Sequence, residues 1–517
     1  MKWAKVIDQR RCIGCHACTI ACKSENEIPS GVTRTFVKQV EAGIFPSVER
    51  HFQVTRCNQC DNPPCVEACP TSAMYQRTDG IVDFNRSICI GCKGCIAACP
   101  YDAIYIDPET HSAEKCNFCT HRIDIGLEPA CVVVCPTQAI SVGDMTDPNS
   151  KISQLISTEK SQVRRPEKGT HPKLFYVEGS EVTLNPLGAT IGKSYMWANR
   201  QSPPSQSRSL PEVMGWPGMI KSQSAYPSQS AAAAVVAYGN DTKPPWDWRV
   251  SSYTWTKSIA AGAFLIGALG EILGTLVTDG LGLATGLISM LFLGLTGLFL
   301  ISDLSHPKRF YLIMLRPQWR SWLARGAYII SGFGLLLTLF LFAILMDMDT
   351  LLKISWWVGL IPAIMVATYT GFLLAQAKGR DLWQNPVLPI HFLVQATLAG
   401  SASILLLNLI FSLSVDEVLW LRWVLGLSLC AHILFVSSEL FMPHATEQSS
   451  RSAKNMTKGK LGLYFWGGFA LSLIAISLTI LSSNFFPWLF VVAIISLTSL
   501  WLHEHAYIQA GQSVPLS

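Results

Sequence analysis

Cysteine and charge are both scarce in the second half of this sequence. Of the seventeen cysteines in the chain, only Cys430 lies beyond residue 136. Residues 252–506 consist of long apolar runs, and the charged residues are confined to short gaps between them. The chain also lacks a basic stripe with interleaved aromatic residues, which argues against nucleic acid as a partner. The sequence therefore divides into a cysteine-rich first half and an apolar second half.

Recognisable targeting and catalytic segments are also missing. The N-terminus, MKWAKVIDQRRC, has no apolar h-region and no twin arginine ahead of one, so we expect no cleaved signal peptide. No segment has the character of a molybdopterin site or a substrate pocket, which assigns any substrate reaction to another chain. Residues 1–195 hold 21 Lys+Arg and 21 Asp+Glu, so the formal net charge of +5 resides in the second half and its linker.

The first half carries a repeated cysteine motif. In the stretch CIGCKGCIAACP, three cysteines are spaced two apart, and a fourth follows after three residues and precedes proline. This spacing lets one tight loop offer three thiolates to one iron–sulfur cube while the fourth thiolate reaches a neighbouring cube. Sixteen cysteines form four such groups: Cys12, Cys15, Cys18, Cys22; Cys57, Cys60, Cys65, Cys69; Cys89, Cys92, Cys95, Cys99; and Cys116, Cys119, Cys131, Cys135.

Other uses of these cysteines fit less well. Zinc ribbons pair two C-x2-C knuckles across a long spacer and do not need a third cysteine followed by C-P. Disulfides would be crowded, and no secretion signal places the chain in an oxidising compartment. Cys430 stands alone in an apolar run, where we expect an ordinary core residue.

Short strands accompany the cysteine loops. The segments CPTSAM, CPYDAI and CPTQAI recur, and in each the proline ends the ligand loop. Residues 80–84 and 103–107 alternate as short strands do, and a further strand is expected around Lys5 to Asp8. The sequence predicts an α+β ferredoxin-like iron–sulfur domain over residues 1–195, built from a duplicated β-loop-α unit.

This domain resembles the four-cluster iron–sulfur subunits of molybdopterin oxidoreductases such as dimethyl sulfoxide and polysulfide reductases. The matching text includes CNQCDNPPCVEACPTSAM and KCNFCTHRIDIGLEPACVVVCPTQAI. In that family the first group pairs with the last and the second with the third. The resemblance implies four 4Fe-4S clusters, since Cys92 is present where some relatives lack a cysteine. The implied ligand sets are Cys12, Cys15, Cys18 with Cys135; Cys116, Cys119, Cys131 with Cys22; Cys57, Cys60, Cys65 with Cys99; and Cys89, Cys92, Cys95 with Cys69.

The second half is predicted to be an all-α membrane bundle of eight transmembrane helices within residues 248–506. Apolar runs of about 20 residues, enough to cross ~30 Å of hydrocarbon, fall at 253–277, 281–302, 326–346, 354–376, 387–412, 418–441, 461–482 and 486–503. Residues 196–247 form a Ser/Pro-rich linker or strap, and the tryptophans Trp216, Trp246 and Trp248 favour the strap. Residues 507–517 are a C-terminal tail.

Positive charge distinguishes the two ends of this bundle. Gaps on the iron–sulfur side carry eleven Lys and Arg residues, and gaps on the opposite side carry only Lys353 and Arg422. This bias predicts that the iron–sulfur domain lies on the cytoplasmic face, and the resemblance to reductase subunits implies a multi-pass protein of a bacterial or archaeal inner membrane. The segments YTWTKSIAAGAFL, DLSHPKRFYLIMLRPQWRSWLARGAY and PHATEQ resemble the NrfD-like anchors of polysulfide reductase, a family that exchanges electrons with quinone and lacks haem. Two subunits that are commonly separate in these families are joined here in one chain, and several relatives are exported with a catalytic partner. The resemblance therefore leaves open on which side of the membrane the iron–sulfur domain lies.

A few ionisable residues interrupt or flank the apolar runs. Such residues mark pathways or binding sites more often than they pack as ordinary core. Glu271 could be a proton-path residue or a simple helix–helix hydrogen bond, and Lys257 could snorkel to the interface. His432 interrupts an apolar run, and His391, behind Pro386 and Pro389, could instead satisfy a carbonyl of a broken helix. Because the quinone headgroup must bind near the docked clusters, the predicted quinone site combines Lys257, Asp303, His306, His391 and Glu439.

These observations predict an electron-transfer and membrane-anchor subunit. It would pass electrons between a menaquinone or ubiquinone pool and a molybdopterin-containing catalytic subunit through four 4Fe-4S clusters. The alternative is a module of a larger quinol-oxidising respiratory complex coupled to ion translocation. A molybdenum-containing partner would favour the first function, and multihaem cytochromes would favour the second.

Overall fold

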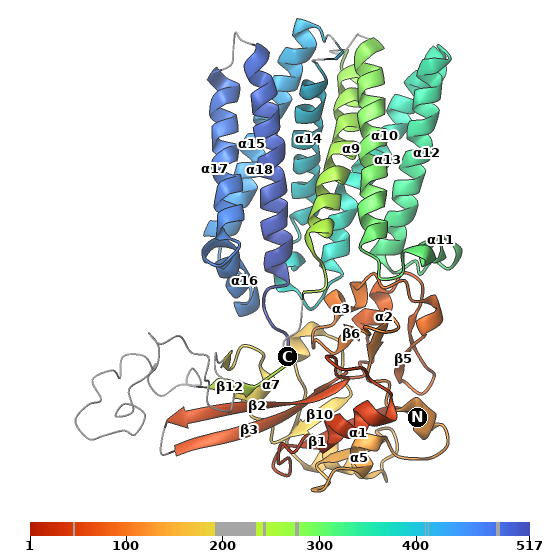
Figure 1. Cartoon of the computed structure of the whole chain (residues 1–517), viewed down its shortest axis with the longest axis vertical. Coiled ribbons are helices and arrows are strands. Elements are labelled where there is room, and N and C mark those ends of the chain that lie inside the picture. Colours follow the sequence, from red (N-terminus) through yellow and green to blue (C-terminus); the bar gives the residue numbers. More distant parts are fainter. Residues whose placement is uncertain are drawn as a thin grey trace, which may run out of the picture.

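The computed structural model describes residues 1–44, 47–191, 234–240, 244–274, 279–408, 410–411, 413–481 and 486–517. A small α/β domain at the N-terminal end sits below a bundle of long helices, and both chain ends lie on the domain's side of the bundle (Figure 1). Most of the predicted linker over 196–247, with Trp216, falls outside the described residues.

The N-terminal strand organises the α/β domain. Strand β1 (Trp3–Asp8) is central in a four-stranded sheet of order β8-β1-β10-β9. It pairs antiparallel with β8 (Ile140–Asp144) and parallel with β10 (Leu174–Val177), and β9 (Ser161–Gln162) completes the edge. The strand expected around Lys5 to Asp8 is confirmed, and Val6 and Ile7 are buried within it.

The polar segment after the first cysteine group forms a long hairpin. Strands β2 (Thr35–Ile44) and β3 (Ser47–Arg56) pair antiparallel along their whole length, and Figure 1 shows them projecting from the domain. Strands β11 (Thr190–Ile191) and β12 (Val235–Tyr238) extend this sheet in the order β11-β12-β2-β3.

Two short ribbons accompany the middle cysteine groups. One pairs β4 (Met74–Gln76) with β5 (Val82–Phe84), and the other pairs β6 (Ile104–Ile106) with β7 (Ala113–Lys115). The strands expected within 80–84 and 103–107 are present as β5 and β6. The small helices of the domain are α1 (Ala17–Glu25), α2 (Pro64–Ala68), α3 (Gly94–Ala98), α4 (Thr120–Ile123), α5 (Ala130–Val133), α6 (Lys151–Thr158) and α7 (Glu181–Leu184).

The second half is helical, and seven of its described helices are long and apolar enough to cross a membrane. They are α10 (Asp279–Ser302), α12 (Trp322–Leu345), α13 (Asp349–Ala375), α14 (Leu388–Leu407), α15 (Val415–Phe441), α17 (Gly462–Leu481) and α18 (Phe486–Gly511). The short helices α11 (Leu312–Leu315) and α16 (Glu447–Lys458) lie between them.

Helix α9 (Trp248–Ile272) has 25 residues and stands beside the other long helices in Figure 1, but it is not among the seven apolar spans. Its sequence carries Arg249, Lys257 and Glu271, and most of its side chains are buried by neighbouring helices instead of facing outward. The eight-span prediction therefore remains a prediction in this one helix.

Close backbone contact explains the small residues of α9. This helix packs against α10, α13, α14 and α18. A side chain at Gly262 would collide with the backbone of Ala396 and Gly400 in α14, so the two helices approach closely only because glycine stands at their crossing. Cys430, expected in the core, is instead exposed on α15, because its side of that helix faces away from the bundle.

Candidate functional site

The sixteen cysteines of the four groups lie in loops and in the short helices next to them; Cys18, Cys22, Cys65, Cys95 and Cys131 are the ones within helices. Several residues in these loops have the left-handed backbone conformation, among them His16, Lys93 and Cys119. This local geometry turns the chain tightly enough for successive thiols to face a common centre. Twelve of the sixteen cysteines are buried, whereas Cys15 is exposed and Cys12, Cys92 and Cys135 are partly exposed.

The fourth cysteine of each group lies with the thiols of another group. Cys22 interacts with Cys116, Cys119 and Cys131, and the amide nitrogen of Asn26 lies 3.7 Å from Cys22 Sγ and 3.8 Å from Cys119 Sγ. The other sets gather in the same manner: Cys12, Cys15 and Cys18 with Cys135; Cys57, Cys60 and Cys65 with Cys99; and Cys89, Cys92 and Cys95 with Cys69. Clustered thiols of this kind suit iron–sulfur cubes, and the four crossed ligand sets stay a prediction.

Positive side chains contact one of these sets. Arg56 donates to Cys131 Sγ at 3.0 Å, and the ammonium group of Lys5 lies 3.8 Å from Cys116 Sγ. Burial raises the pKa of the Cys116 thiol, but the charges of Lys5 and Arg56 outweigh burial and bring that pKa down to about 7. The two positive side chains therefore favour the thiolate form of Cys116, which is the form that binds iron.

The cysteine loop of residues 89–99 docks on the helical bundle. The backbone N–H groups of Ser305 and His306 donate to the carbonyls of Gly91 and Ile90 at 3.2 and 3.1 Å, and Arg309 donates to the Cys89 carbonyl at 3.0 Å. A side chain at Gly91 would collide with Ser305, so glycine permits this approach. Nearby, the Gln318 N–H donates to the carbonyl of Pro70, so the loop around 316–320 is part of the docking surface.

An apolar cavity of about 210 Å³ lies directly behind this interface, between α9, α10, α12 and α13. Cys92 and Asp303 line it together with the aromatic residues Trp246, Tyr253 and Tyr369. The indole of Trp246 donates to the Cys92 carbonyl at 3.3 Å and stacks on Trp383. One wall of the cavity is thus formed by a cysteine of the cluster domain.

The cavity opens toward the outside of the bundle. Phe310 and Ser331 lie in its lining and are exposed, whereas the lining residues Tyr253 and Tyr369 are buried. Its remaining walls are largely aliphatic, with Leu300 and Ile330 among them. A flat apolar molecule could enter from the hydrocarbon side and place a polar edge against Asp303.

Asp303 connects the cavity with the cluster domain. Its carboxylate accepts a hydrogen bond from Lys93 Nζ at 2.8 Å, and Lys93 is the residue after Cys92. Burial raises the pKa of Asp303, although the charge of Lys93 acts in the opposite direction. Of the five residues predicted for a quinone site, Asp303 is the one that lines this cavity.

The other four predicted residues lie at different places among the described residues. Lys257 is fully buried, so it does not snorkel: its Nζ donates to the Ala367 carbonyl at 2.7 Å. The ring of His306 contacts the Thr110 carbonyl at 2.9 Å and so docks the two domains. His391 and Glu439 belong to the part of the bundle formed by α14, α15 and α18, where Glu439 hydrogen-bonds Tyr507.

Sequence reasoning missed several buried polar groups. Tyr253 and Tyr369 read as ordinary aromatic residues of apolar runs, and Glu504 follows the end expected for the last helix. The structure buries Glu504, which accepts a hydrogen bond from Thr254 at 2.8 Å. Carboxylates are rare in the apolar runs, so a carboxylate within a helix is a signal of function. Extending the last run by one residue beyond 503 would have included Glu504 and drawn attention to it. Glu271, by contrast, is exposed near the end of α9.

Comparisons with known families match both halves of the chain. Residues 48–145 match the 4Fe-4S dicluster domain, and residues 237–515 match the family described as polysulphide reductase, NrfD. The second match alone covers more than half of the 517 residues.

Individual relatives match the cysteine-rich half. A component of the polysulfide reductase of Wolinella succinogenes is 48% identical over 179 residues, which cover 34% of this chain and 94% of the relative. A component of the tetrathionate reductase of Salmonella typhimurium is 44% identical over 190 residues, covering 36% and 76%. The arsenate respiratory reductase iron–sulfur subunit of a Shewanella species is 36% identical over 225 residues, covering 34% and 96%. Each match is confined to about a third of this chain.

Proposed function

We propose that this chain, which belongs to the polysulphide reductase NrfD family, links a quinone pool to a catalytic subunit. It joins the membrane domain of that family to a 4Fe-4S electron-transfer domain. The chain is the electron-transfer and membrane-anchor subunit of an oxidoreductase complex. The observation that carries the proposal is the apolar cavity with Cys92 in its wall and Asp303 at its polar end.

Four 4Fe-4S clusters would be held by the four thiol sets, because each set supplies the four thiolates that one cube needs. When bound, these groups supply one-electron transfer between the membrane and the partner subunit. The set of Cys89, Cys92, Cys95 and Cys69 is next to the cavity, and Cys15 of another set is exposed at a different place on the domain. Electrons could thus enter the chain at one of these places and leave it at the other.

The cavity suits a menaquinone or ubiquinone headgroup. A quinone needs an apolar slot for its ring and a proton-exchanging group at its oxygen, because two protons accompany its two electrons. Asp303 can hold such a proton, and Lys93 beside it stabilises the charged carboxylate. Tyr253 and Tyr369 hydrogen-bond each other and form a polar edge of the otherwise aliphatic wall.

Helix α9 would be the eighth membrane span. Its Lys257 is enclosed by neighbouring helices, with its ammonium group 4.5 Å from the ring centroid of Phe392, so the charge does not meet lipid. Eight spans would return the chain to the side from which it started. This agrees with the position of both chain ends on the iron–sulfur side in Figure 1.

The catalytic partner would dock on the part of the iron–sulfur domain near α1 and α5, which pack together. Six large apolar side chains are exposed on this part: Ile13, Ile20, Ile125, Leu127, Val133 and Val134. Exposed apolar patches of this kind mark protein interfaces. The relatives named above are components of polysulfide, tetrathionate and arsenate reductases, and by analogy we assign this chain a molybdopterin-containing reductase subunit as partner.

The iron–sulfur domain would face the cytoplasm of a bacterial or archaeal cell, following the eleven-to-two bias of positive residues. Protease added outside intact cells should then leave residues 1–240 uncut. Cleavage in the Ser/Pro-rich linker under these conditions would reverse this sidedness.

Co-purification and metal analysis test the proposed function. Anaerobically purified complex should contain about sixteen iron atoms per copy of this chain, together with a molybdenum-containing large subunit. Ile20→Glu combined with Val133→Glu should release that subunit without loss of iron, whereas Val48→Glu, at an exposed position of strand β3 in the same domain, should not. An iron content near eight in folded protein would contradict four clusters, and multihaem cytochromes in place of molybdenum would favour a quinol-oxidising respiratory complex.

A further inference from the structure

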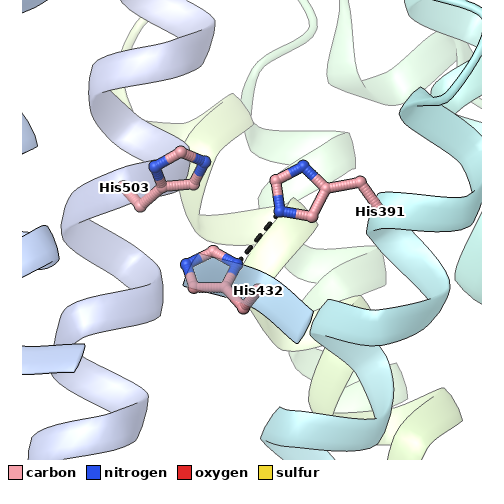
Figure 2. Close-up of side chains that lie close together, drawn as sticks. All are labelled: His391, His432 and His503. Atoms are coloured by element: carbon pink, nitrogen blue, oxygen red, sulfur yellow. Dashed lines mark hydrogen bonds between the residues drawn. The ribbon is translucent and has the colours of Figure 1, made fainter. Parts of the chain in front are cut away.

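Three histidines from three different helices meet inside the bundle. His391 lies near the start of α14, His432 lies in α15 and His503 lies in α18, and each is buried, with at most 7% of its surface exposed. Figure 2 shows the three rings gathered around a common space. One ligand nitrogen from each lies within 4.8 Å of the other two, and His391 Nε2 is 3.0 Å from His432 Nδ1.

We propose that this histidine trio binds one transition-metal ion, with Zn²⁺ as the ion that fits it best. Neutral imidazole is a preferred ligand of zinc, and three histidines that leave a fourth position open form a known type of zinc site. The inference is independent of the quinone cavity, which lies between α9, α10, α12 and α13.

The spacing of the nitrogens is close to what an ion requires. Ligand nitrogens 2.0–2.1 Å from a tetrahedral zinc ion lie about 3.3 Å from one another. The His391–His432 pair is already near this separation, and since all three nitrogens lie within 4.8 Å of one another, the third would have to approach by at most about 1.5 Å. The ring planes of His432 and His503 are 89° apart, with centroids separated by 4.9 Å, so the two rings approach the common space from different directions.

The side-chain amide of Gln395, beside the trio, indicates a missing hydrogen-bond donor. The amide nitrogen of Gln395 lies 3.4 Å from His391 Nε2, while its carbonyl oxygen is buried and has no hydrogen-bond partner among the described residues. Gln395 is 3% exposed. An orphaned buried oxygen costs stability unless something satisfies it. A metal-bound water in the fourth position would supply the missing donor to this amide.

Aromatic side chains surround the trio, and a carboxylate that could balance the charge of a metal ion lies nearby. The ring of Phe435 stacks on that of His391 with a centroid separation of 5.1 Å. The ring centroids of Phe465 and Tyr507 lie 6.2 and 6.3 Å from that of His503. Glu439, hydrogen-bonded to Tyr507, lies two helical turns beyond His432, about 10 Å along α15. Its carboxylate would offset part of the ion's charge from the side of the iron–sulfur domain.

Zinc binding can be measured on the full-length, detergent-purified chain with its iron complement intact. The protein is dialysed against a chelator, incubated with Zn²⁺, desalted and assayed for zinc and iron. We expect about one zinc per chain, with X-ray absorption showing only nitrogen or oxygen neighbours near 2.0–2.1 Å. His432→Phe and His503→Phe should each lower the zinc content at least tenfold.

The matched control is His505→Phe. His505 lies on the same helix two residues from His503, but it stacks on Trp501 and contacts Ser251 instead of joining the trio. This variant should retain its zinc. Sulfur neighbours near 2.3 Å would place the zinc on cysteines and overturn the proposal. The absence of zinc from the unsubstituted chain would overturn it too, as would equal zinc in all variants. Because the absorption spectrum is taken on the unsubstituted protein, poor folding of a variant leaves the proposal testable.

Discussion

Helices α9, α10, α12 and α13 enclose an apolar cavity with Asp303 at one end, whereas α14, α15 and α18 enclose three histidines. The cavity is bounded by Cys92 of the cluster domain. Within the described part of the chain, the histidine trio has no cluster cysteine among its hydrogen-bond and ring contacts. Proximity to the cluster cysteines therefore distinguishes residues suited to the proposed electron exchange from buried polar residues suited to another role, such as the proposed metal site.

The largest expected effect separates two carboxyls, one in each half. Asp303→Asn keeps the side-chain shape but removes the proton acceptor, so quinol-linked turnover should fall about 100-fold or more. Glu439→Gln, in the other half, should leave turnover within about twofold. Turnover is measured with a soluble quinol and then with an artificial donor that reduces the clusters directly. If both variants lose quinol turnover equally, the functional division of the bundle is wrong.

Filling the cavity should have a smaller effect. Ala327 lines the cavity on α12, and Ala327→Phe would occupy the space of a quinone ring and raise KM for quinol about tenfold. Leu434→Phe is the control, since Leu434 is exposed on α15 in the opposite half. The assay is quinol titration at fixed enzyme concentration. An unchanged KM in Ala327→Phe would move the quinone elsewhere in the bundle.

The smallest expected effect is a displacement of the pH profile. In the proposed quinol oxidation Asp303 accepts a proton and must be deprotonated, so turnover should decline as pH falls through the pKa of this carboxyl. Lys93 lowers that pKa against the effect of burial. Lys93→Met should therefore move the acidic limb of the profile to higher pH, whereas Lys378→Met, at an exposed ion pair with Glu67, should not. A limb that stays in place in Lys93→Met would exclude Asp303 as the titrating group.

The sequence predicted the local features well because they depend on short-range spacing. The cysteine loops, strand β1 and the approximate positions of the apolar helices follow from motif and periodicity within a few residues. The cavity and the histidine trio depend on which helices become neighbours, and no spacing within one helix reports that. His391, His432 and His503 are far apart in the sequence, and Tyr253 and Tyr369 carry no charge to draw attention.

Charge counting illustrates a second limit. The positive residues on the iron–sulfur side indicate a membrane orientation when only the sequence is considered. Several of them also hold the domains together: Arg309 donates to the Cys89 carbonyl, Arg380 pairs with Asp102, and Arg451 donates to the Leu187 carbonyl. The same charges thus have a docking role that the sequence alone could not reveal. The excess of positive residues on this side therefore reflects both membrane orientation and domain docking.

The bond between Lys93 and Asp303 has a consequence for the order of assembly. Lys93 belongs to a cysteine loop of the iron–sulfur domain, and Asp303 directly follows helix α10 of the bundle. Until the first domain has folded and seated itself, the carboxyl at the cavity has no Lys93 ammonium beside it. The cavity then also lacks the wall that Cys92 supplies, and no cluster lies beside it to receive electrons. An immature chain would therefore leave the membrane's reducing equivalents untouched, and quinol would be consumed only by copies whose electron acceptor is already in place.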